Sequence, residues 1–150
     1  MTAAPAGAGA ADSFALRPSL VDAAVEVVSV ERSGEGGSAL TAVTTIGIEK
    51  TEQLFDGHYA DFPIFPGVCV MECVQRSVIA VAERSGMAEP ELLAVESTRF
   101  LGAVYPGDLL TVHLDVRNDD EGTLRCRAKA FTERGDAASV RLRMTGEVAA

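Results

Sequence analysis

The sequence is poor in residues that bind metals: it has only two histidines and three cysteines in 150 residues. Neither set shows the spacing of a metal site, so we expect no metal. Cys69 and Cys73 lie one helical turn apart in an apolar run, and Cys126 makes the count odd. This pattern favours small buried hydrophobic side chains over disulfides, and with them a reducing compartment, the cytoplasm.

Long apolar runs and glycine-rich phosphate loops are also absent. No run approaches the length that a membrane-spanning helix needs, so we expect no membrane contact. Without a phosphate loop or a metal site, we expect no cofactor of the protein's own. The first residues are rich in alanine, glycine and proline but lack a basic segment. We therefore expect residues 1–16 to be a disordered tail, not a secretion signal, and residues 17–150 to be a single domain.

Basic residues are outnumbered, since 13 Lys and Arg against 22 Asp and Glu give a net charge of −9. Such a chain lacks the basic footprint of a nucleic-acid-binding protein, which excludes a general role of that kind. Residues 123–150 differ, because their six basic and three acidic residues give +3 and leave −12 for the rest. This local basic face fits an acidic partner, and it equally fits the solvated faces of two strands.

A helix is predicted after Pro66, which suits the first turn of a helix because its missing N–H costs nothing there. From Val68 to Ala82 the only charged side chains are Glu72 and Arg76. A helix with so few charges is expected to be buried almost all round. It should end near Gly86.

Six strands are predicted from apolar and β-branched patterns. The clearest alternation runs from 110 to 117, where Leu110, Val112, Leu114 and Val116 share one face. His113 lies on the opposite, polar face, so we expect it to face solvent. The remaining predicted strands cover residues 23–30, 38–49, 92–100, 123–130 and 140–144.

Strands that are apolar on one face only indicate an antiparallel sheet with one wet side. The single long helix must then lie against the dry side, which gives an α+β fold with a sheet wrapped around one central helix. One helix does not easily cover a sheet of this size. We therefore expect exposed edges to pair with a second copy, in a homodimer.

The stretch between the second and third predicted strands carries an unusual set of residues. It reads Phe55-Asp-Gly-His58, then Pro63-Ile-Phe-Pro66-Gly67-Val68, then Glu72 and Gln75. Further along come Arg99-Phe100 and Tyr105-Pro-Gly-Asp108. These segments resemble the signature of the hot-dog-fold 3-hydroxyacyl-[acyl carrier protein] dehydratases, over roughly residues 20–147.

The resemblance implies dehydration of (3R)-hydroxyacyl thioesters to trans-2-enoyl thioesters, in fatty-acid or polyketide synthesis. The substrate would arrive on the phosphopantetheine of an acyl carrier protein. The resemblance also implies a dimer, or a trimer of dimers, with each active site shared across a subunit interface.

Four positions depart from the family pattern. Tyr59 and Ala60 follow the histidine where the family has Phe-Pro, Phe62 stands where a small polar residue is common, and Cys73 replaces alanine. We expect Tyr59 and Phe62 to line an acyl tunnel or to serve in packing. These departures affect the substrate more than the chemistry, because His58 and Glu72 keep their identity and spacing.

Dehydration needs a base at the α-carbon, an acid at the leaving hydroxyl and donors for the thioester oxygen. His58, with an ordinary pKa near 6.5, suits the base. Burial beside apolar neighbours would raise the pKa of Glu72 and suit it to the acid role. The N–H groups of Gly67 and Val68 at the helix start suit the thioester oxygen. In the plainer alternative, His58 is a turn residue and Glu72 pairs with Arg76.

Other functions remain open at this stage. One is a hot-dog thioesterase, which directs water onto the thioester and does not need the Gly-His turn. Another is a non-catalytic acyl-binding partner subunit, and a third is the reverse hydration of enoyl thioesters. Carrier docking would use a basic surface, for which the candidates are Arg76, Arg84, Arg99 and the arginines of the last strands.

Overall fold

The computed structural model of the chain describes residues 23–48 and 65–149. The predicted tail 1–16, and with it His58, Tyr59 and Phe62, lies outside the described residues. The described elements are strands β1 (Val25–Ser33) and β2 (Ala39–Gly47), helix α3 (Gly67–Arg84), strands β3 (Leu92–Phe100), β4 (Leu109–Asn118), β5 (Thr123–Thr132) and β6 (Gly135–Thr145), and the short 3-10 helix η1 (Glu35–Gly37).

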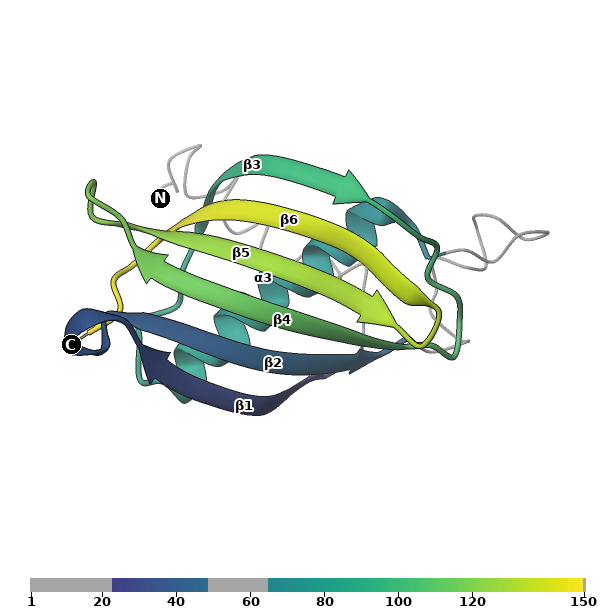
Figure 1. Cartoon of the computed structure of the whole chain (residues 1–150), viewed down its shortest axis with the longest axis horizontal. Helices are drawn as coiled ribbons and strands as arrows, with labels where there is room; N and C mark the ends of the chain where they lie inside the picture. The colour runs from purple at the N-terminus through teal and green to yellow at the C-terminus, as the bar shows by residue number, and fades with distance from the viewer. Residues whose placement is uncertain (1–22, 49–64, 150) are drawn as a thin grey trace, which may run out of the picture.

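The six strands form one antiparallel sheet in the order β1-β2-β4-β5-β6-β3. Helix α3 crosses one face of this sheet, and the other face is open (Figure 1). β1 and β3 are therefore the two edge strands. The predicted α+β hot-dog architecture, with a sheet on one long helix, is confirmed.

Alternation along the central strands decides which face is dry. In β4 the side chains of Leu110, Val112, Leu114 and Val116 are buried, while His113 and Arg117 are exposed. The predicted solvent-facing position of His113 is confirmed, and its ring meets Phe131 edge-on at 5.0 Å between centroids. β5 and β6 repeat the pattern, so the strands bury one face against α3 and expose polar residues on the other.

Helix α3 is buried on one side only. Its buried residues fall at helical spacing toward the sheet, whereas Val68 is 60% exposed. The prediction of burial almost all round is therefore wrong for the described part of the single chain. A scarcity of charge made the helix look wholly buried, but one sheet covers only one side of a helix.

A glycine ends the helix as predicted. Gly86 adopts a φ of 75°, which favours glycine because a Cβ would crowd the backbone there. The N–H of Met87 donates to Ala82 O at 2.9 Å and that of Gly86 to Glu83 O at 3.1 Å. This double closure is a Schellman motif, and it satisfies carbonyls that the last turn would otherwise leave unpaired.

The three cysteines are buried and form no disulfide, as predicted. Cys69 and Cys73 lie on the sheet-facing side of α3, and Cys126 lies on the dry face of β5. Burial raises the pKa of the Cys126 thiol to about 12. A thiol with so high a pKa is a packing group and a poor nucleophile.

Candidate active site

Glu72 lies in a groove between α3 and the β3 side of the sheet. The cavity has a volume of about 240 Å³. Its helical wall is a stripe at three- and four-residue spacing, and its other wall comes from β3 and β6. The lining residues are Val68, Met71, Glu72, Gln75, Leu92, Val95 and Leu142. A half-buried carboxylate thus faces a largely apolar hollow in which it and Gln75 are the polar side chains.

The strand residues of this wall come from distant parts of the sequence. Val95 of β3 pairs with Leu142 of β6 in the sheet register. Thr98 of β3 lies 3.7 Å from the sulfur of Met71, which holds β3 against the helix. Sequence reasoning missed Met71, Leu92, Val95 and Leu142, because only the strand register shows that they meet Glu72.

The start of α3 supplies two backbone donors near the groove. Pro66 occupies the N-cap with φ −63° and ψ 149°, so the helix begins one residue later, at Gly67. The first bonds of the helix run from Cys69 and Val70 to Pro66 O, at 2.9 and 3.2 Å. The N–H groups of Gly67 and Val68 therefore have no carbonyl of their own helix to donate to. They lie at the positive end of the helix dipole, where oxygen anions are favoured.

The absence of a Cβ at Gly67 leaves room for the ring of Phe100. A Cβ built on Gly67 would fall 2.7 to 3.0 Å from three atoms of that ring. Phe100 is 54% exposed and ends β3, so an aromatic ring from the edge strand lies across the helix start. The sequence motif included both Gly67 and Phe100, but it did not show that the two are in contact.

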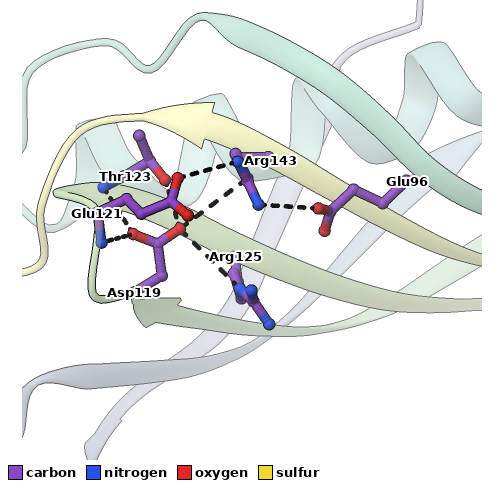
Figure 2. Close-up of polar contacts among 6 residues, drawn as sticks. All are labelled: Glu96, Asp119, Glu121, Thr123, Arg125 and Arg143. Carbon is purple, nitrogen blue, oxygen red and sulfur yellow. Dashed lines mark hydrogen bonds and ion pairs between the residues drawn. The ribbon is translucent and has the colours of Figure 1, made fainter.

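An ionic cluster occupies the turn between β4 and β5 (Figure 2). Asp119 accepts hydrogen bonds from the Thr123 hydroxyl and from the backbone N–H groups of Thr123 and Glu121, at 2.5, 3.0 and 2.8 Å. These bonds lower the pKa of Asp119 to about 2, and the bond from the Thr123 hydroxyl has the largest effect. Arg143 lies 3.2 Å from Glu96 and 3.3 Å from Glu121. The cluster closes a hairpin and neutralises Arg143.

The open face of the sheet carries a second, different set of cations. In the register, Arg127 of β5 lies directly opposite Arg141 of β6, and Lys129 lies opposite His113. No carboxylate of the described residues lies within 4.0 Å of Arg127, Lys129 or Arg141. A hollow of about 310 Å³ opens among these side chains. Asp115, which lies opposite Arg127 in the register, also lines this hollow, so three basic side chains meet one carboxylate among the described lining residues.

Membrane and metal sites were also sought in the described ranges. Among residues 23–48 and 65–149 no helix is long and apolar enough to cross a membrane. The same residues hold no group of three or more His, Cys, Asp and Glu side chains that could bind a metal ion.

Comparison with known proteins assigns the chain to a family. Residues 34–140 match the ApeI-like family model, described as ApeI dehydratase. The chain belongs to the ApeI-like dehydratase family. Over 104 residues this ApeI-like protein is 35% identical to the 3-hydroxyacyl-[acyl-carrier-protein] dehydratase FabZ of Actinobacillus pleuropneumoniae serotype 5b (strain L20). The match covers 66% of each chain, so the chain spans just under two thirds of that relative's length.

Solved structures show the same fold at low identity. The smu.793 protein of Streptococcus mutans UA159 bound to acetyl CoA has a TM-score of 0.63 at 15% identity, covering 84% of this chain and 90% of that one. The dehydratase heterocomplex ApeI:P of Xenorhabdus doucetiae has a TM-score of 0.53 at 17% identity, covering 79% and 96%. The fold thus occurs in the ApeI:P complex and in a protein that binds acetyl CoA.

Proposed function

We propose that this ApeI-like protein dehydrates (3R)-hydroxyacyl thioesters on acyl carrier protein to trans-2-enoyl thioesters. The observation that carries the proposal is the position of Glu72 in an apolar groove whose rim is the start of α3. An acid and two backbone donors are two of the three parts that elimination from a β-hydroxy thioester requires, and the third is a base at the α-carbon.

Each proposed residue has a role in one step of the elimination. His58 removes a proton from the α-carbon, and the electron pair moves toward the thioester carbonyl. The N–H groups of Gly67 and Val68 stabilise the charge that develops on the carbonyl oxygen. The pair then forms the new double bond as the C–O bond to the 3-hydroxyl breaks. Glu72 donates its proton to that hydroxyl, which leaves as water.

We further propose that the active protein is a homodimer, or a trimer of dimers, assembled through β3. Among the described residues no strand pairs with the outer side of this edge strand, and Leu92, Leu93 and Val95 on it are 39 to 51% exposed. An exposed apolar edge is a template for pairing with another strand. A second copy there would cover the groove, of which Leu92 and Val95 are a wall. Since the ApeI:P neighbour is a heterocomplex, light scattering of the purified chain decides whether it pairs with itself.

The carrier protein is proposed to dock on the basic surface of Arg127, Lys129, Arg141 and Arg99. Among the candidates from the sequence, Arg84 donates to Val27 O at 3.2 Å, and Arg125 and Arg143 belong to the Asp119 cluster. Lys129 and Arg99 both pair with Ser139 in the register, so the cations continue to the edge strand. The next residue, Phe100, points to the other, helix-covered face of β3, where its ring lies against Gly67 at the proposed site.

Charge reversal tests this docking surface. R127E and R141E are expected to raise KM for the carrier-bound substrate while kcat for a short pantetheine-bound analogue is unchanged. R117E is the matched control, because Arg117 lies on the same face but is paired with Asp115 at 2.9 Å. Equal KM values for R127E and the wild type on the carrier would exclude this surface.

The main alternative is a thioesterase, because the fold is shared with a protein from Streptococcus pneumoniae TIGR4 described as a hypothetical thioesterase, at a TM-score of 0.62 and 15% identity. A thioesterase releases free thiol, whereas a dehydratase forms an enoyl thioester that absorbs in the ultraviolet. Following both signals with one 3-hydroxyacyl thioester decides between them. The absence of both signals would indicate an acyl-binding partner subunit. A net loss of enoyl absorbance from an enoyl substrate would report the reverse hydration.

We also propose that the protein works in the reducing cytoplasm, in keeping with three buried thiols that form no disulfide.

A further inference from the structure

The turn before β4 is bonded to two distant segments of the chain. The N–H of Gly107 donates to Ile48 O at 2.5 Å, and the N–H of Ile48 donates to Asp108 O at 2.9 Å. The N–H of Phe65 donates to Val104 O at 2.7 Å. Ile48 and Phe65 are the residues on either side of segment 49–64, which contains His58. Both ends of that segment are therefore fixed to a single turn.

The same turn is closed by its own aspartate. Asp108 accepts a hydrogen bond from the backbone N–H of Tyr105 at 2.9 Å, and its own N–H donates to Tyr105 O at 3.0 Å. Only 12% of the Asp108 side chain is exposed. The carboxylate thus fixes the backbone that holds Ile48 and Phe65.

Arg134 secures this turn from the neighbouring hairpin. It donates to both carboxylate oxygens of Asp108, from Nη2 at 3.1 Å and from Nε at 3.4 Å. Its guanidinium also lies 4.7 Å from the centre of the Tyr105 ring. A two-pronged bond to a carboxylate and a ring beneath the cation fix an arginine better than either contact alone.

We propose that Arg134 is a positioning residue: through Asp108 and Tyr105 it holds the two chain ends that flank the His58 segment. The Phe65 end leads directly into Pro66 and Gly67, so Arg134 also fixes the start of α3. The kinetic part of this inference rests on the proposed dehydration.

Arg117 supplies a matched control. Like Arg134 it is an exposed arginine with two bonds to one aspartate, at 2.9 and 3.3 Å, and the two side chains are 65% and 59% exposed. Asp115, however, is hydrogen-bonded to no turn that holds another segment. Loss of an exposed ion pair as such would affect both arginines alike.

The test measures amide hydrogen exchange by NMR in the full-length wild type, R134A, R134K and R117A. R134A should speed exchange at Ile48, Phe65 and Gly107 by roughly tenfold, with Val112 and Leu142 unchanged. R134K should recover part of this protection, and R117A should match the wild type. Unchanged exchange at the three amides in R134A, or equally faster exchange at Val112, would overturn the proposal.

Kinetics supplies the second arm of the same test. R134A should lower kcat by about 10- to 100-fold with KM little changed, because misplaced catalytic groups affect the chemical step. Faster exchange with a normal kcat would show that the turn is not a positioning device. A wild type without dehydratase activity would refute the proposed function. The exchange data would still test whether Arg134 holds Ile48 and Phe65 in place.

Discussion

The hydroxyl of Thr44 donates a hydrogen bond to Ser77 Oγ at 2.7 Å, and both side chains are completely buried. Thr44 lies on β2 and Ser77 on the sheet-facing side of α3, so this polar bond joins helix to sheet inside an apolar core. A buried pair of this kind fixes where along the helix the sheet packs.

Removing one partner of this bond should cost more than removing both. Ser77→Ala leaves the Thr44 hydroxyl buried without its acceptor, at a cost of about 1–3 kcal/mol in the free energy of unfolding. Adding Thr44→Val should return most of that loss, because two apolar groups leave no unsatisfied donor. Urea unfolding of both single variants and the double variant measures the coupling. If the two single losses of unfolding free energy simply add in the double variant, the proposed coupling is contradicted.

Gly67→Ala should impair the helix start through Phe100. Its Cβ would fall 2.7 to 3.0 Å from the ring, so the half-exposed ring and the helix start must shift relative to each other. The Gly67 and Val68 amides would shift. The fall in kcat should therefore exceed what any loss of folded protein accounts for. Phe100→Leu in the same chain should restore part of the activity by vacating the space. Full activity in Gly67→Ala would show that these two amides are not donors to substrate.

Acid should weaken the fold through Asp119. Its pKa of about 2 in the folded state lies below the ordinary value of roughly 3.9. The ionised carboxylate therefore contributes stability above about pH 4, and this contribution is lost as the pH falls toward 2. The difference in unfolding free energy between wild type and Asp119→Asn should be largest at neutral pH and shrink below pH 4. A difference that stays constant from pH 7 to 2.5 would contradict the assignment.

The thiols should resist modification in the folded protein. Cys69, Cys73 and Cys126 are each at most 1% exposed, and the pKa of Cys126 is raised to about 12. We expect no labelling by a thiol reagent at pH 8 and complete labelling in denaturant. Rapid native labelling at any of the three would show that the core opens there.

Sequence patterns predicted the sheet well and the groove only in part. The alternation of Leu110 to Val116 identified the buried face, because side chains of a strand alternate sides whatever the strand pairs with. The position of β3 at an edge, beside β6, depends on long-range pairing that no local pattern encodes. Leu142 therefore could not be assigned to the wall that faces Glu72. The motif, by contrast, pointed to Glu72, Gly67 and Val68 directly.

The error on α3 has a similar origin. A lack of charge indicates that a helix avoids water, but it does not say which neighbour covers each side. Val68 is exposed in the single chain and lines the groove, so its apolar character suits a surface for substrate or for a second subunit.

The most direct test of the central claim is mass spectrometry of 3-hydroxyacyl carrier proteins of several chain lengths after incubation with wild type, His58→Ala and Glu72→Gln. Glu83→Gln, on the exposed side of the same helix, is the control. We predict loss of one water with the wild type and the control, and turnover lowered by about 100-fold or more in both site variants, with the fold retained. Near-normal water loss in both site variants, or release of free carrier thiol by the wild type instead of water loss, would contradict the account.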